Sequence, residues 1–266
     1  MFLVKDLGEL EGDVLLFGGS YSNAHALGAL FDIAEELDFS PKNRICTGDA
    51  VAYCGAVLET LELMENACEW LAGNCEKQLV AQADTCGCGF RAGSVCDVLS
   101  KGWFSFASGV IGADGRARMS LCPDLIVFTN RGTRYGVVHG GYSDISRFLW
   151  PSSPEKDFEQ EFSALQAEHG SLDAIISGHC GMAFQRNIGT KSWINAGAIG
   201  MPPHDGRPQT RYVVLGEDGA RIKRLDYDVA AAGDQMRKVG LVQGYEIALK
   251  TGYWPSDGIL PQALRS

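Results

Sequence analysis

The chain has 266 residues and a mass of 28.7 kDa, which is enough for one large domain with a substantial core. Hydrophobic residues make up 45% and charged residues 21%, the balance of a globular protein. The net charge of −10 argues against a nucleic-acid duplex or an anionic membrane surface as a partner, because both bind basic patches.

The N-terminal segment turns acidic within its first eleven residues, too early for a signal peptide. No run approaches the ~18 apolar residues of a transmembrane helix. The nine cysteines are an odd number in a chain without an export signal. We therefore expect a cytoplasmic protein with reduced thiols.

Farther along, the first third of the chain alternates strands with amphipathic helices. The apolar run 13–17 predicts a buried strand, and apolar residues recur at helical spacing over 24–37. A short strand is expected at 44–47 and a second helix at 56–69. This order indicates an α/β sheet, in which functional groups gather at the carboxyl ends of strands.

The remainder begins irregularly and then becomes rich in strands. Between 75 and 118, the Gly-rich run Cys86–Phe90 and the aromatic run Trp103–Phe106 predict a loop and then a helix packed over the strand ends. Further strands are expected at 125–129, 135–138, 174–177, 211–216 and 221–227, with a helix at 155–169. We expect a single domain over 1–266, in which 229–266 is a C-terminal extension with one helix.

Four short segments at predicted strand ends each supply one potential metal ligand. These ligands are Asp49, Asn74, His139 and His179, each next to a glycine. A carboxylate, an amide oxygen and two imidazoles suit a divalent metal such as Mn, Fe or Zn, without distinguishing among them. Singly, Gly-Asp and Gly-Asn are common turn pairs and a lone histidine is usually a core residue. Together the four predict one metal pocket.

These segments carry a resemblance to the calcineurin-like metallophosphoesterases over most of the chain. The matching segments, in family order, are Asp13–Leu27 (opening strand and turn), Cys46–Tyr53 (Gly-Asp), Gly73–Glu76 (Gly-Asn-His-Asp/Glu), Val137–Gly141 (Val-His-Gly), Ser177–Gly181 (Gly-His-x-His) and Trp193–Gly200 (Asn-Pro-Gly-Ser-Val-Gly). The resemblance implies an α/β fold, a four-layer metallophosphoesterase-like β-sandwich flanked by helices. The tail resembles an extension of some bacterial members.

The resemblance also implies which ligands are kept. One metal's set is complete: Asp49, Asn74, His139 and His179. The other set is degenerate, since its positions hold Gly19, Tyr21 and Gly181, so we expect one divalent metal and a second that is absent or weak. Cys75 replaces the family's general-acid histidine and, with Asn74, occupies the catalytic positions.

Several residues have alternative interpretations. Tyr21 either fills the space of the missing metal or reaches a metal or phosphate oxygen. Three histidines could be drawn toward a site, but His25 is expected to turn away on its helix, His204 to lie in a solvated loop, and His169 to lie at a helix C-terminus. A zinc cluster of Cys75, Cys86, Cys88 and Cys96 would lack the usual Cys-x₂₋₄-Cys pairs.

For function, the resemblance implies a metal-dependent phosphoesterase that hydrolyses phosphomonoesters or phosphodiesters by a metal-activated hydroxide. Its activity is expected to be reduced or altered, because one metal site and the general-acid histidine are lost. The alternative is a catalytically inactive pseudoenzyme that serves as a binding or regulatory module. The expected partner is a small phosphorylated substrate or phosphate-bearing ligand, with no nucleic-acid duplex and no membrane.

Overall fold

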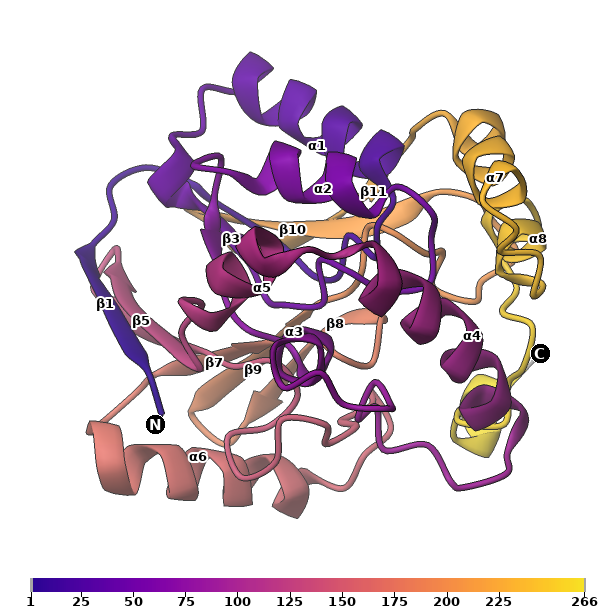
Figure 1. Ribbon diagram of the computed structural model, residues 1–266. Helices are drawn as coiled ribbons and strands as arrows, with labels where there is room; N and C mark the ends of the chain where they lie inside the picture. Colours follow the sequence, from indigo (N-terminus) through magenta and orange to yellow (C-terminus); the bar gives the residue numbers. More distant parts are fainter. Residues whose placement is uncertain (1, 266) are drawn as a thin grey trace.

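The structure, a computed structural model, describes residues 2–265. Two β-sheets face each other at its centre, and helices cover their outer sides (Figure 1). The five-stranded sheet contains, in spatial order, β11 (Gly219–Leu225), β10 (Thr210–Gly216), β2 (Val14–Phe17), β3 (Arg44–Cys46) and β4 (Glu69–Trp70). Strands β2, β3 and β4 run parallel to one another, whereas β10 is antiparallel to both of its neighbours.

The second sheet has six strands. They are, in spatial order, β1 (Val4–Glu9), β5 (Leu125–Asn130), β6 (Thr133–Val137), β7 (Ala174–Ser177), β9 (Lys191–Ala196) and β8 (Ala183–Ile188). Strands β6 and β7 are parallel, as are β7 and β9. Their carboxyl ends therefore lie at one edge of this sheet.

Side-chain alternation along β2 shows how the layers form. Val14 and Leu16 point into the core between the two sheets, whereas Leu15 and Phe17 pack against helix α1 (Ala24–Glu36). Helix α2 (Val57–Met64) lies beside α1, and helix α6 (Glu155–His169) covers the outer face of the six-stranded sheet (Figure 1). The expected four-layer α/β sandwich flanked by helices is therefore confirmed.

Five further helices flank the sandwich. They are α3 (Asn74–Val80), α4 (Val95–Val110), α5 (Ala113–Ser120), α7 (Val229–Lys238) and α8 (Tyr245–Thr251). Two short 3-10 turns also occur, at Pro41–Asn43 and Gln262–Leu264. A common apolar cluster contains Trp103 of α4, Met236 of α7 and Leu249 of α8. The C-terminal segment therefore carries two helices where one was expected.

The second helix is shorter than its sequence predicts. It ends at Met64, because Glu65 is already extended with a ψ of 115°, and Asn66 then adopts a left-handed conformation with a φ of 57°. The residues Glu69 and Trp70 then form β4, which pairs with β3. Strand β1 was also not foreseen, since its mostly exposed residues lack an apolar pattern. Across residues 2–265, none of the helices combines the length and the apolar character needed to cross a membrane.

Candidate metal centre

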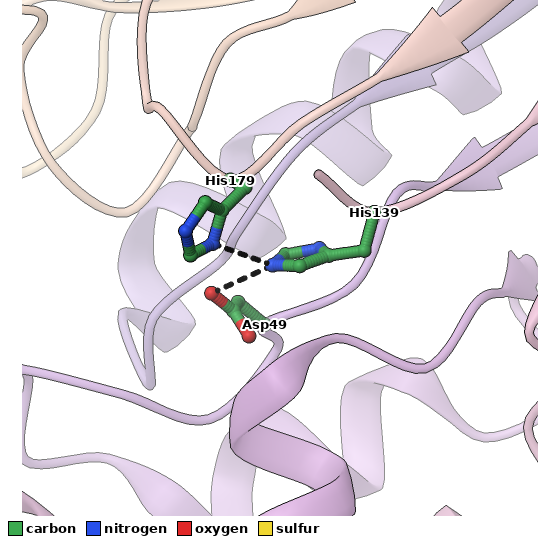
Figure 2. A group of neighbouring side chains, drawn as sticks. All are labelled: Asp49, His139 and His179. Carbon is green, nitrogen blue, oxygen red and sulfur yellow. Dashed lines mark hydrogen bonds and ion pairs between the residues drawn. The ribbon is translucent and has the colours of Figure 1, made fainter. Parts of the chain in front are cut away.

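The four predicted ligands converge between the two sheets. Asp49 follows β3, Asn74 opens α3 just after β4, His139 follows β6 and His179 follows β7. The carboxyl ends of β3 and β4 in one sheet and of β6 and β7 in the other come together, so side chains distant in sequence meet there (Figure 2). Asp49, His139 and His179 are the one group of three or more His, Cys, Asp or Glu within residues 2–265 whose potential ligand atoms come together.

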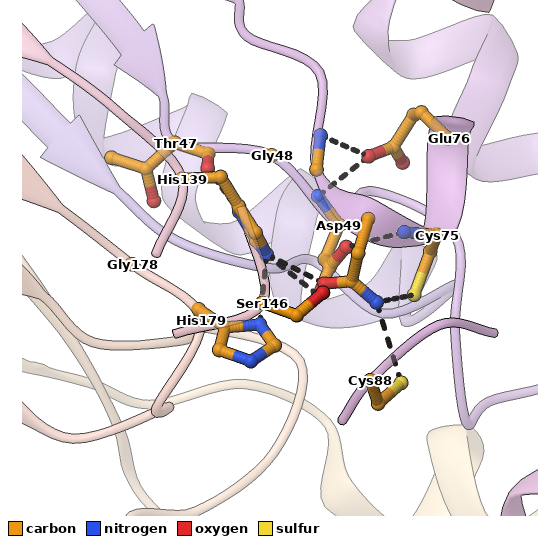
Figure 3. Close-up of polar contacts among 12 residues, drawn as sticks. Thr47, Gly48, Asp49, Cys75, Glu76, Cys88, His139, Ser146, Gly178 and His179 are labelled. Atoms are coloured by element: carbon orange, nitrogen blue, oxygen red, sulfur yellow. Dashed lines mark hydrogen bonds and ion pairs between the residues drawn. The ribbon is translucent and has the colours of Figure 1, made fainter. Parts of the chain in front are cut away.

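His139 has a defined tautomer. Its Nδ1 lies 2.6 Å from the carbonyl oxygen of Thr47, which can only accept, so Nδ1 carries the hydrogen. In the neutral ring Nε2 is then an acceptor. It faces Asn74 Oδ1 at 3.0 Å, His179 Nδ1 at 3.1 Å and Asp49 Oδ2 at 3.2 Å (Figure 3).

This cluster brings together four atoms that can each act as a metal ligand. Without a metal, a hydrogen on His139 Nε2 or on His179 Nδ1 can bridge only part of the cluster, because one hydrogen cannot serve all three contacts. Four ligands at ~2.1 Å from a tetrahedral metal lie about 3.4 Å apart. The three separations from His139 Nε2, of 3.0, 3.1 and 3.2 Å, come close to that spacing, and the ligand atoms of Asp49, His139 and His179 all lie within 4.8 Å of one another. The donor set therefore fits a divalent cation.

The charges of the buried groups are set by burial and by one another. Burial opposes the charged form of Asp49, but the adjacent His139 outweighs it, so the pKa of Asp49 is lowered. Burial likewise lowers the pKa of His139, yet the Asp49 carboxylate raises it above its usual value. Burial and then His139 lower the pKa of His179 to about 3. His179 is therefore neutral at pH 7, the form that binds metals.

Two of the ligands adopt backbone conformations that are unusual for residues with a side chain. Asp49 has a φ of 57° and His179 a φ of 60°, both in the left-handed region. Such conformations cost on the order of 1–3 kcal/mol and cluster at functional sites. Here the surrounding contacts hold both loops in place.

Glu76 supplies the strongest of these contacts. Its side chain is fully buried, and one carboxylate oxygen accepts the backbone N–H groups of Asp49 and Gly73, each at 2.8 Å (Figure 3). It thereby ties the loop after β3 to the loop before α3. Burial, and then the charge of Asp49, raise the pKa of Glu76 to about 7. Sequence reasoning included Glu76 in a motif but gave it no role.

The loop at Cys86–Cys88 orients the Asn74 amide. Asn74 Nδ2 donates to the Cys86 carbonyl at 2.9 Å and lies 3.4 Å from Cys88 Sγ, which leaves Oδ1 facing His139. Cys86 and Cys88 are joined by a disulfide, so the expectation of reduced thiols is wrong for this pair. Their Cα atoms are 5.4 Å apart, a separation that a disulfide can span.

The three positions of the degenerate second set lie together. A Cβ on Gly19 would meet the Tyr21 ring at 2.1 Å, and a Cβ on Gly181 would lie 3.7 Å from the Tyr21 hydroxyl. The Tyr21 ring is buried and packs edge-on against Tyr53 at 4.8 Å. Aromatic side chain thus occupies the space beside these glycines.

Cys75 is buried next to Asp49. Burial, followed by the charge of Asp49, raises the pKa of the Cys75 thiol well above its usual value, so the thiol stays protonated. Its backbone N–H donates to Asp49 Oδ1 at 3.1 Å. Cys75 therefore contributes to the cluster through its main chain and through its Sγ atom, which lies 3.6 Å from Asn74 Nδ2.

The remaining histidines lie apart from the cluster. His25 is exposed on α1, as expected. His169 ends α6, with Nε2 at 3.0 Å from the Tyr142 hydroxyl. The expectation for His204 is wrong: it is buried, and its Nδ1 accepts the backbone N–H of Trp254 at 2.9 Å. The C-terminal segment folds over its loop and removes it from solvent.

Comparisons with known proteins agree with this geometry. No family model matches the sequence, and no curated protein matches it. Among solved structures, a metallophosphoesterase from Sphaerobacter thermophilus superposes with a TM-score of 0.68 at 18% identity, covering 91% of this chain and 100% of that one. This chain has the metallophosphoesterase fold.

A second solved structure has a similar extent. A hypothetical protein from Pyrococcus horikoshii superposes on this chain with a TM-score of 0.74 at 16% identity. The match covers 91% of this chain and 99% of the other.

Proposed function

We propose that this chain is a phosphoesterase that works with one divalent metal held by Asp49, Asn74, His139 and His179. The observation that carries the proposal is the meeting of four buried potential ligand atoms, in which Asn74 Oδ1, His179 Nδ1 and Asp49 Oδ2 lie 3.0–3.2 Å from His139 Nε2. A bound divalent metal supplies Lewis-acid polarisation of a phosphoryl oxygen and lowers the pKa of water. The metallophosphoesterase fold supports phosphoric esters as the substrates.

The chain's own groups define how this activity would differ from that of a two-metal enzyme. Asp49 and His179 face the pocket, while Glu76 and the Thr47 carbonyl hold the ligands from behind. The Cys75 thiol is too weak an acid to protonate a leaving group well. General acid catalysis is typically worth ~10²–10⁴-fold. We therefore propose that the enzyme is slow on poor leaving groups and favours esters of acidic alcohols.

A binding module without catalysis is the second candidate. The packing of Tyr21 over Gly19 favours it, because the ring occupies space where a second metal's ligands would be needed. Such a module would retain the metal and a phosphate-bearing ligand but not turn the ligand over.

Metal analysis combined with a phosphoesterase panel tests the proposal. The wild-type chain should take up a divalent metal and hydrolyse an aryl phosphoester. His139→Ala should lose both, and His25→Ala, which changes an exposed histidine outside the cluster, should lose neither. Metal uptake without turnover of any ester in the panel would favour the binding module. Full activity in His139→Ala would refute the site.

A further inference from the structure

A pocket opens over the metal cluster, and its floor and rim differ in character. Its buried floor includes Asp49 and His179, whereas Phe90, Phe148 and Trp254 are partly exposed and form the rim. The rim residues come from three separate segments: the loop after α3, the loop after β6, and the C-terminal segment. Aromatic groups thus surround the entrance to the acceptor cluster.

The aromatic rim contacts the ligands themselves. The ring of Phe148 lies 4.3 Å from the His179 ring, centroid to centroid, and 6.2 Å from the ring of Phe90. The pocket encloses about 60 Å³. An apolar cavity that holds benzene measures about 150 Å³. A phosphoryl group can therefore sit inside, whereas an attached ring has to lie at the entrance against these aromatic faces.

The charge of the pocket limits what kind of phosphate it accepts. In the part of the chain that the structure describes, the residues lining the pocket include no lysine or arginine, and Asp49 is their one carboxylate. A divalent cation combined with Asp49 and neutral imidazoles leaves at most one net positive charge, because the buried Glu76 carboxyl lies directly behind Asp49. A phosphodiester, with one negative charge, neutralises it. A phosphomonoester carries about −1.5 to −2 near pH 7 and leaves an excess in an apolar setting.

We propose that this pocket selects singly charged phosphodiesters that carry a flat aromatic group, in preference to phosphomonoesters and to purely aliphatic esters. The proposal rests on the proposed function for the position of the phosphoryl group at the metal. It adds that Phe90 and Phe148 are specificity-determining residues, because their rings border the entrance where the ester's ring would lie, although Trp150 already stacks on one side of Phe148 at 5.3 Å. The net charge of −10 of the whole chain acts in the same direction, against dianions.

Three inhibitors that cannot be hydrolysed separate ring recognition from charge. Methyl(phenyl)phosphinate is a monoanion with a ring, dimethylphosphinate is a monoanion without one, and phenylphosphonate at about pH 8.5 is a dianion with a ring. Their affinities for the manganese-loaded full-length protein are measured by titration calorimetry. We expect methyl(phenyl)phosphinate to bind at least tenfold more tightly than either of the others.

Two variants and one control locate the recognition. Phe148→Leu and Phe90→Leu keep an apolar side chain but remove the ring, and each should weaken methyl(phenyl)phosphinate at least threefold while leaving dimethylphosphinate unchanged. Phe148 contacts His179, a proposed metal ligand, so the manganese affinity of the Phe148→Leu protein must be measured first. Phe90→Leu is therefore the more decisive variant. Phe2→Leu, at a residue 47% exposed and outside the pocket, should change neither affinity.

The outcomes distinguish this proposal from the proposed function. Equal affinity for the two phosphinates, tighter binding of phenylphosphonate, or no binding of any of the three overturns the selectivity. Preferential binding of methyl(phenyl)phosphinate by a protein that hydrolyses no ester supports the selectivity and refutes the phosphoesterase.

Discussion

Replacing Glu76 by alanine should destabilise the protein severely. The side chain is fully buried, and one oxygen accepts the Asp49 and Gly73 N–H groups at 2.8 Å each. Leaving a buried donor unsatisfied costs about 1–3 kcal/mol, so two such donors cost about 2–6 kcal/mol. That is a large part of a typical stability of ~5–15 kcal/mol. Urea unfolding of the metal-free protein measures the loss, and metal affinity should fall with it.

Glu76→Gln is the matched control, because its amide oxygen can still accept both N–H groups. Its loss should be less than half that of Glu76→Ala. The Glu76 pKa in the folded state, about 7, lies above the ordinary 4.5, so its contribution is greatest below pH 4.5 and is lost as pH rises toward 7. The difference between wild type and Glu76→Gln should therefore shrink over that range. If Glu76→Ala lies within about 1 kcal/mol of wild type, the structural role assigned to this carboxylate is wrong.

Further predictions concern metal content, pH dependence and the degenerate positions. Elemental analysis should find at most one tightly bound divalent metal per chain; two would contradict the single-metal proposal. The pKa of His179 falls from 6.5 to about 3 on folding, so the metal-free protein should lose stability relative to His179→Gln as pH drops through that interval. If the two proteins lose stability in parallel as pH falls, the ring is not buried in its neutral form. Gly19→Asp should be tolerated only together with Tyr21→His, since an added Cβ would meet the tyrosine ring at 2.1 Å; equal urea midpoints for the single and double variants would disprove the clash. Adding Gly181→His and Cys75→His to that double variant should permit a second metal and raise the rate of aryl-ester hydrolysis at least tenfold, which corresponds to ~1.4 kcal/mol in the activation barrier. Two bound metals without faster hydrolysis would exclude ligand loss as the cause of low activity.

The sequence by itself predicted many of the helices and strands and the four candidate ligands, whereas the four-layer arrangement was implied by the family resemblance. Helix α6 occupies the expected residues 155–169, and the strands that deliver His139 and His179 lie where apolar runs placed them. These features are local: a helical or alternating pattern of apolar residues and a polar residue just after it can be recognised without knowing its neighbours in space. The four side chains come from strands of two different sheets, so their convergence was expected from the family resemblance and not from a local pattern.

Only the tertiary structure decided what surrounds those ligands. Glu76 bonds to Asp49 across 27 positions of sequence, and Phe90, Phe148 and Trp254 reach one pocket rim from three distant segments. The short strand β4 exists through its pairing with β3 rather than through its own pattern. No local periodicity encodes such long-range contacts, because each depends on how whole elements pack. The ligand types therefore follow from the sequence, whereas their support and the character of the pocket follow from packing.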